Sequence, residues 1–156
     1  MSIRVTTRHS EDFDICAESL EPEKSPYARG VRDYAAKVKA FYQQLGVRSA
    51  MWTTPEAERP KHLETQKTIE YVLEVDERKV VAYVDESSWS DYLYGKREDF
   101  SFSKTPRQYA ITSILITTPV TKGEVKAIRR YRRTNGPDRY ELAEEKLFSA
   151  EKPFCR

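Results

Sequence analysis

The chain has 156 residues, and its 27 Lys and Arg against 25 Asp and Glu leave a net formal charge of only +2. That balance argues against a domain dedicated to polyanions. The content of 38% apolar and 12% aromatic residues is enough for a real core, so we predict a single folded domain, 1–156.

Cysteine, histidine and apolar runs exclude other classes of protein. The two Cys and two His lie far apart in the sequence, so we expect neither a metal site nor a disulfide framework. No apolar run approaches the roughly 18 residues of a membrane-spanning helix, and the first residues lack the apolar core of a signal peptide. We therefore expect a cytoplasmic protein without a membrane partner.

Residues 26–45 are predicted to form one long helix. Ser25 is a suitable N-cap, Pro26 fits a first turn, and Gly46 ends the helix. Apolar side chains recur at alternating spacings of four and three: Tyr27, Val31, Tyr34, Val38, Phe41 and Leu45. Three repeats rich in aromatic residues favour a stripe packed on a sheet over a coiled-coil seam.

After the helix the apolar period changes to two, which is typical of strands. Residues 47–54 ("VRSAMWTT") predict a short strand that stops at Pro55. Residues 68–75 ("TIEYVLEV") predict a second strand, in which apolar residues alternate with Glu70 and Glu74. This alternation indicates a half-buried strand with the glutamates on the exposed side.

Residues 79–84 ("KVVAYV") predict a further strand, and residues 87–95 ("SSWSDYLYG") predict a short helix with Trp89 facing inward. The aromatic residues of this helix have a second interpretation, an exposed anchor for a partner protein, because Trp and Tyr dominate interface energies. Residues 96–108 are polar and irregular and predict a mobile loop.

The strand predicted over residues 109–120 ("YAITSILITTPV") is β-branched on both faces, so we expect it in the centre of a sheet, ending at Pro119. Residues 124–133 ("EVKAIRRYRR") are predicted to pair with residues 139–145 ("RYELAEE") in a C-terminal β-hairpin. The predicted fold class is α+β, with a central antiparallel or mixed sheet and the helix 26–45 on one face.

The basic hairpin 122–139 contains four arginines and a tyrosine in succession: Arg129, Arg130, Tyr131, Arg132 and Arg133. Two interpretations are open. The return strand offers Glu141, Glu144 and Glu145, which would neutralise much of the charge, and exposed pairs of this kind contribute only about 0–1 kcal/mol each. Alternatively, the five residues form a surface for an acidic protein or a nucleic acid, whose affinity would fall steeply with salt.

One resemblance rests on the order of the elements. A first strand with an arginine ("SIRV") is followed by a long helix, by "MWTTPEAE", by "YVLEVDERKVVAYVDESSW" and by "SILITTPVTKGEVKAIRRY". This order, over residues 1 to about 145, resembles the small mono-ADP-ribosyltransferases. In that family an opening strand supplies an arginine or histidine to the dinucleotide, a second strand a Ser/Thr-rich triplet beside the nicotinamide, and a later strand the catalytic glutamate.

The resemblance implies NAD as the ligand, Arg4 as a phosphate or ribose contact, and Thr53 and Thr54 as pocket-lining hydroxyls beside Trp52. An arginine can hold a diphosphate through paired donors, and a tryptophan can stack on a flat ring. The residues alone also allow a plainer interpretation. In it, Arg4 lies on the surface of an edge strand, Trp52 lies in the core, and the two threonines are ordinary strand formers.

The chain departs from the family at the catalytic glutamate. That residue would be expected at Ser113, directly before "ILIT", with a partner two residues earlier at Ile111. Its carboxylate binds the ribose hydroxyl and stabilises the positive charge that develops on the sugar as nicotinamide leaves. A serine cannot do so. Three alternatives are open: the strand register differs from the one assumed, Glu98 or Glu141 supplies the carboxylate from elsewhere, or the fold binds its ligand without catalysis.

Two hypotheses for the function follow. The first is an ADP-ribosyltransferase-like domain that binds NAD or a related nucleotide, with or without turnover. The second is a non-enzymatic binding or inhibitor module that contacts an acidic protein or a nucleic acid through the basic hairpin 122–139.

Overall fold

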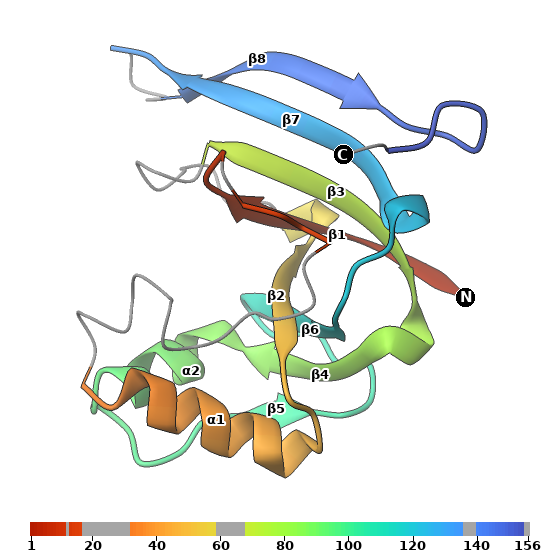
Figure 1. Cartoon of the computed structure of the whole chain (residues 1–156). Helices are drawn as coiled ribbons and strands as arrows, with labels where there is room; N and C mark the ends of the chain where they lie inside the picture. The colour runs from red at the N-terminus through yellow and green to blue at the C-terminus, as the bar shows by residue number, and fades with distance from the viewer. Residues whose placement is uncertain (12, 17–31, 59–67, 136–139, 155–156) are drawn as a thin grey trace. The chain divides into compact units, whose positions relative to one another are not determined.

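The computed structural model describes residues 1–11, 13–16, 32–58, 68–135 and 140–154. These residues have an α+β fold in which strands predominate and every strand pairing is antiparallel. They divide into two compact units (Figure 1). The single domain predicted for 1–156 stays a prediction.

Unit 1 comprises Met1–Cys16, Thr54–Glu77 and Val120–Arg156. Its strands, in hydrogen-bonded order, are the end of β2 (Ala50–Pro55), β1 (Ser2–His9), β3 (Ile69–Asp76), β7 (Val125–Arg133) and β8 (Tyr140–Leu147). β1 pairs with β3 along its whole length, and both are flanked by other strands, so their apolar side chains form the core of the unit. Val5, Val72 and Leu73 are fully buried there.

Unit 2 comprises Ala17–Thr53 and Arg78–Pro119. Its strands, in hydrogen-bonded order, are β5 (Phe102–Ser103), β4 (Val80–Asp85), β6 (Thr112–Thr117) and the beginning of β2. The helices α1 (Tyr34–Leu45) and α2 (Glu86–Leu93) pack on the core of this sheet. That core contains Val38, Phe41, Tyr42, Ala50, Ala82, Val84, Trp89 and Leu115.

The helix predicted over residues 26–45 is observed as α1 and ends at Gly46 with φ +76° and two backbone hydrogen bonds. Its predicted start is wrong for residues 32 and 33, which form a turn. The reason is local, because Asp33 has φ +59°, a left-handed conformation that interrupts a right-handed helix. Residues 17–31, with the predicted cap at Ser25 and Pro26, lie outside the described residues.

The other predicted elements of unit 2 lie within a few residues of their expected places. The strand predicted over 109–120 is the shorter β6, which has a neighbour on each side and is buried on both faces, as its β-branched pattern predicted. The helix predicted over 87–95 is α2, in which Trp89 is buried. This burial favours the core role of Trp89 over the role of an exposed anchor.

The half-buried character predicted for β3 is wrong. Five consecutive side chains from Ile69 to Leu73 are buried, and Glu70 among them has no exposed surface. The alternation of polar and apolar residues is present, yet the polar side is covered as well. β3 lies between β1 and β7, and side chains from both strands reach across to Glu70.

β7 and β8 pair antiparallel, with Arg130 opposite Glu144 and Arg132 opposite Glu141. A bulge between Arg130 and Tyr131 shifts the register. The connecting residues 136–139 lie outside the described residues.

Candidate functional site

A partly buried carboxylate, that of Glu86, lies beside Ser113 in unit 2. β4 ends at Asp85 and α2 begins at Glu86, while Ser113 pairs with Val84 across β4 and β6. The Ser113 hydroxyl donates a hydrogen bond of 2.5 Å to Glu86 Oε2. Ser113 itself is only 8% exposed. Glu86 is held from the backbone as well, because its N–H donates to the carbonyl of Ile111 at 3.0 Å.

The surroundings of Glu86 favour its protonated form. Burial raises the pKa of Glu86 above its ordinary value, the hydrogen bond from Ser113 opposes this rise, and the neighbouring Asp85 adds to it. Perturbed carboxyls of this kind are characteristic of functional sites, although structural groups show them too. Glu86 was not among the predicted site residues, because nothing in "VDESSW" indicates that the pairing of β4 with β6 brings Ser113 to it.

The other position implied by the resemblance, Ile111, is 54% exposed. The two carboxylates proposed as replacements lie elsewhere. Glu98 is exposed between α2 and β5, and Glu141 forms an ion pair with Arg132 in the hairpin of unit 1. The carboxylate that contacts Ser113 is thus Glu86 rather than either predicted candidate.

The residues predicted to line a nicotinamide pocket serve the packing of their strand. The hydroxyl of Thr53 is buried and donates to the carbonyl of Ile114 at 2.7 Å. The indole N–H of Trp52 donates to the Tyr42 hydroxyl at 2.9 Å, and its ring lies 5.0 Å from that of Trp89. Burial raises the pKa of Tyr42 to about 12, although the hydrogen bond from Trp52 acts to lower it. These contacts are those of the plainer interpretation.

In unit 1, Arg4 and Thr54 also have partners in the protein. The Arg4 guanidinium donates to Glu56 at 2.9 Å and is 48% exposed. The carbonyl of Thr54 accepts a long hydrogen bond of 3.5 Å from the Thr6 hydroxyl. The phosphate contact implied for Arg4 stays a prediction, and it would compete with Glu56.

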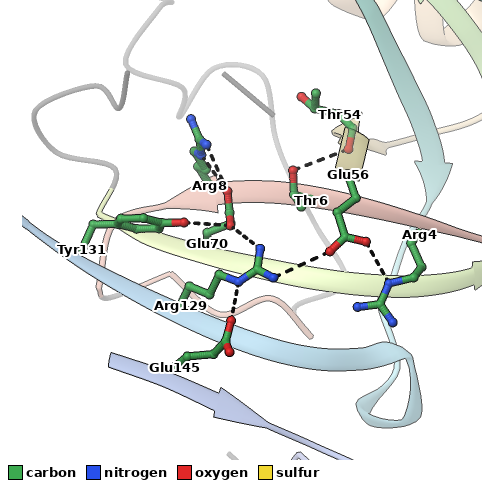
Figure 2. A network of polar contacts seen from close by, with 9 residues as sticks. All are labelled: Arg4, Thr6, Arg8, Thr54, Glu56, Glu70, Arg129, Tyr131 and Glu145. Carbon is green, nitrogen blue, oxygen red and sulfur yellow. Dashed lines mark hydrogen bonds and ion pairs between the residues drawn. The ribbon is translucent and has the colours of Figure 1, made fainter. Parts of the chain in front are cut away.

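A fully buried carboxylate, that of Glu70, is the centre of a polar network in unit 1 (Figure 2). Arg8 donates to its Oε2 at 3.0 and 3.1 Å. Arg129 and the Tyr131 hydroxyl donate to its Oε1 at 3.0 and 3.1 Å. Both oxygens of a fully buried carboxylate are thereby satisfied, which is the condition under which such a charge is tolerated.

Arg129 connects this network to the hairpin and to the 3-10 helix η3 (Glu56–Glu58), which follows β2. It contacts Glu145 at 2.6 Å and Glu56 at 3.6 Å in addition to Glu70. Burial lowers its pKa, but hydrogen bonds to Glu145 and Glu70 more than compensate, so the pKa of the Arg129 guanidinium is raised. Glu145 is one of the glutamates predicted to neutralise the hairpin, whereas nothing in the sequence indicated the contact with Glu70.

The remaining residues of the basic hairpin are largely paired. Arg130 lies 4.0 Å from Glu144, and Arg132 forms an ion pair with Glu141, so the predicted partners on the return strand are the observed ones. Tyr131 is taken by Glu70. Arg133 is exposed at the end of β7. The positive charge of the basic hairpin is therefore mostly neutralised within the hairpin itself.

The described part of the chain lacks the features of two other kinds of site. It holds no cluster of three or more His, Cys, Asp or Glu that could bind a metal ion. None of its helices has the length and apolar character needed to span a membrane. In comparisons with known proteins, no family model, curated protein or solved structure matches the chain.

Proposed function

We propose that the chain is an ADP-ribosyltransferase-like domain that binds NAD or a related nucleotide and that Glu86 supplies its carboxylate. The observation that carries the proposal is the hydrogen bond between Glu86 and Ser113. It brings a carboxylate from the start of α2 to the position on β6 at which the resemblance leads us to expect one. Ser113 is then a positioning residue.

The strand order supports the same proposal. The resemblance requires the strands of Thr53 and Ser113 to be neighbours, and β2 pairs with β6 with Thr53 opposite Ile114. A carboxylate is also chemically suitable, since it can accept a hydrogen bond from a ribose hydroxyl and stabilise positive charge on the sugar. The Thr53 hydroxyl already donates a hydrogen bond to the backbone. Thr53 would therefore shape the wall of the site rather than bind the ligand through its hydroxyl.

The charge of Glu86 sets a condition on catalysis. Only the ionised carboxylate stabilises a developing positive charge. Because the pKa of Glu86 is raised, the active fraction should increase as the pH rises through that value. A domain that binds the nucleotide without turnover would show no such dependence.

The test is incubation with NAD, with nicotinamide release and calorimetric binding as the two readouts. We expect Glu86→Gln to abolish release while it retains the melting temperature within a few degrees. Glu98→Gln is the matched control, because Glu98 is an exposed glutamate, and this variant should behave as the unmodified chain. Binding heat without release would indicate a non-catalytic NAD module. Absence of both at millimolar NAD would refute the proposal.

The alternative proposal is a non-enzymatic module that binds an acidic protein or a nucleic acid through the basic hairpin 122–139. Its support is weaker, because Arg129, Arg130 and Arg132 each have a carboxylate within 4.0 Å. Titration with short RNA at two salt concentrations distinguishes the two proposals. Micromolar binding that weakens with salt and is lost in Arg130→Gln with Arg132→Gln would favour the module.

A further inference from the structure

Unit 1 contains a pocket of about 210 Å³ on the face of its sheet opposite to Glu70. Ile69 and Tyr71, which flank Glu70 in β3, both line it, as expected for side chains that alternate across a strand. Its volume is below the roughly 300–1,000 Å³ of pockets for drug-sized ligands. The pocket therefore suits a molecule with a single ring and a short side chain.

The inner wall of the pocket is apolar and aromatic. Ile69, Tyr71, Ile128 and Phe154 line it and are all at least 93% buried. Phe154 contacts the ring of Tyr71 edge to face at 6.4 Å and that of Phe148, another lining residue, at 5.4 Å. These rings form a surface on which a flat apolar group is favourably buried.

The rim of the pocket is charged, and its cations outnumber its carboxylates. Arg130 and Lys146 line the pocket with Glu11. The two cations share one carboxylate, Glu144, at long distances of 4.0 and 3.6 Å. Arg129, on the opposite face, has three carboxylates within 3.6 Å and is only 15% exposed. Arg130 and Lys146 are thus more available to an added anion than Arg129 is.

We propose that this pocket binds a small carboxylic acid with an aromatic ring, with the ring against Tyr71 and Phe154 and the carboxylate at Arg130 and Lys146. Arginine binds carboxylates through paired, charge-assisted hydrogen bonds. The ligand carboxylate would replace Glu144, whose contacts with both cations are long. The inference is independent of the NAD proposal, which concerns residues of unit 2.

The probe is phenylacetate, and its uncharged isostere phenylacetamide is the comparison. We expect millimolar binding of phenylacetate, detected as NMR shifts of the backbone amides of Ile128, Arg130 and Phe148. Phenylacetamide should bind about tenfold more weakly or not at all, since it lacks the negative charge that strengthens hydrogen bonds from Arg130 and Lys146. Equal affinity for the two probes, or no shift with tens of millimolar phenylacetate, would overturn the proposal.

Two substitutions should change the affinity in opposite directions. Arg130→Gln should weaken phenylacetate binding about tenfold. Glu144→Gln should tighten it, because it removes the carboxylate that competes for both cations. A pocket that bound the ring alone would respond to neither. Arg133→Gln is the matched control, because Arg133 lies on the same strand but does not line the pocket, and an equal loss in this variant would contradict the assigned site.

N-acetylphenylalanine distinguishes two sources of the same chemistry. If it binds as tightly as phenylacetate, the pocket accepts the carboxyl end of a peptide chain. If only phenylacetate binds, the pocket takes a free acid. Both results support the proposed class of ligand and identify its source.

Discussion

Glu70 of β3 lies directly opposite Arg129 of β7 in the strand register, and the two side chains are joined by a hydrogen bond of 3.0 Å. Arg8 of β1 reaches the same carboxylate from the other side at 3.0 Å. The fully buried carboxylate of Glu70 therefore links side chains of the three adjacent strands β1, β3 and β7. Buried pairs of this kind are costly to break, because removal of one partner leaves the other charge uncompensated.

Glu70→Gln should accordingly destabilise the protein by about 3 kcal/mol, because the amide keeps the shape of the side chain but leaves Arg8 and Arg129 with too little negative charge nearby. Urea unfolding measures the change. Glu74→Gln, on the same strand but partly exposed, is the control, and a loss below about 0.5 kcal/mol is expected for it. Equal effects of the two substitutions would show that the buried ion pairs of Glu70 contribute no more to the free energy of unfolding than the contacts of an exposed glutamate.

Arg129→Lys should cost about 2 kcal/mol, because a single ammonium cannot make the separate hydrogen bonds that the guanidinium makes to Glu145 and Glu70. Arg132→Lys, at an exposed pair with Glu141, should change the free energy of unfolding by less than about 0.5 kcal/mol. Thermal melts of the two variants provide the comparison. If Arg132→Lys lowers the stability as much as Arg129→Lys, the Glu70 network contributes no more to stability than the exposed ion pair of Arg132 with Glu141.

Glu86 should make stability depend on pH in a definite direction. Its folded pKa is raised above the ordinary value of 4.5, so the folded state holds its proton more firmly than the unfolded state. The resulting stabilisation is fully present below pH 4.5 and is lost as the pH rises through the raised pKa. In Glu86→Gln this dependence disappears.

The measurement is urea unfolding of the unmodified chain and of Glu86→Gln between pH 4 and pH 8, as a difference at each pH, because other carboxyls contribute equally to both proteins. The difference should shift in favour of the glutamine variant as the pH rises. A difference that is constant, or that shifts the other way, contradicts the raised pKa.

Tyr42 predicts a second pH effect at the alkaline end. Its folded pKa of about 12 exceeds the ordinary value of 10.0, so its contribution to stability is present below pH 10 and is lost as the pH rises toward 12. Absorbance titration of the folded protein should show a phenol ionisation near pH 12 that is lost in Tyr42→Phe. Tyr92→Phe, a partly buried tyrosine, should retain this late transition.

Several features of the fold could be read from the sequence because they depend on local patterns. The β-branched run of β6 identified a central strand, since only a strand covered on both faces is apolar on both. Gly46 identified the end of α1, because few other residues adopt its positive φ without strain. The charges of β7 and β8 were matched in sequence, and their ion pairs are formed between neighbouring strands.

The environments of Glu70 and Glu86 could not be predicted in the same way. Glu70 occupies a position of the β3 alternation that normally faces water, and it is covered only because Arg8 and Arg129 arrive from positions 62 and 59 residues away. Glu86 meets Ser113 across 27 residues because β4 and β6 pair in a particular register. Local pattern determines which face a side chain takes along its own strand. Only the tertiary pairing of strands determines what covers that face, and with it whether a glutamate is a solvated charge or a buried one.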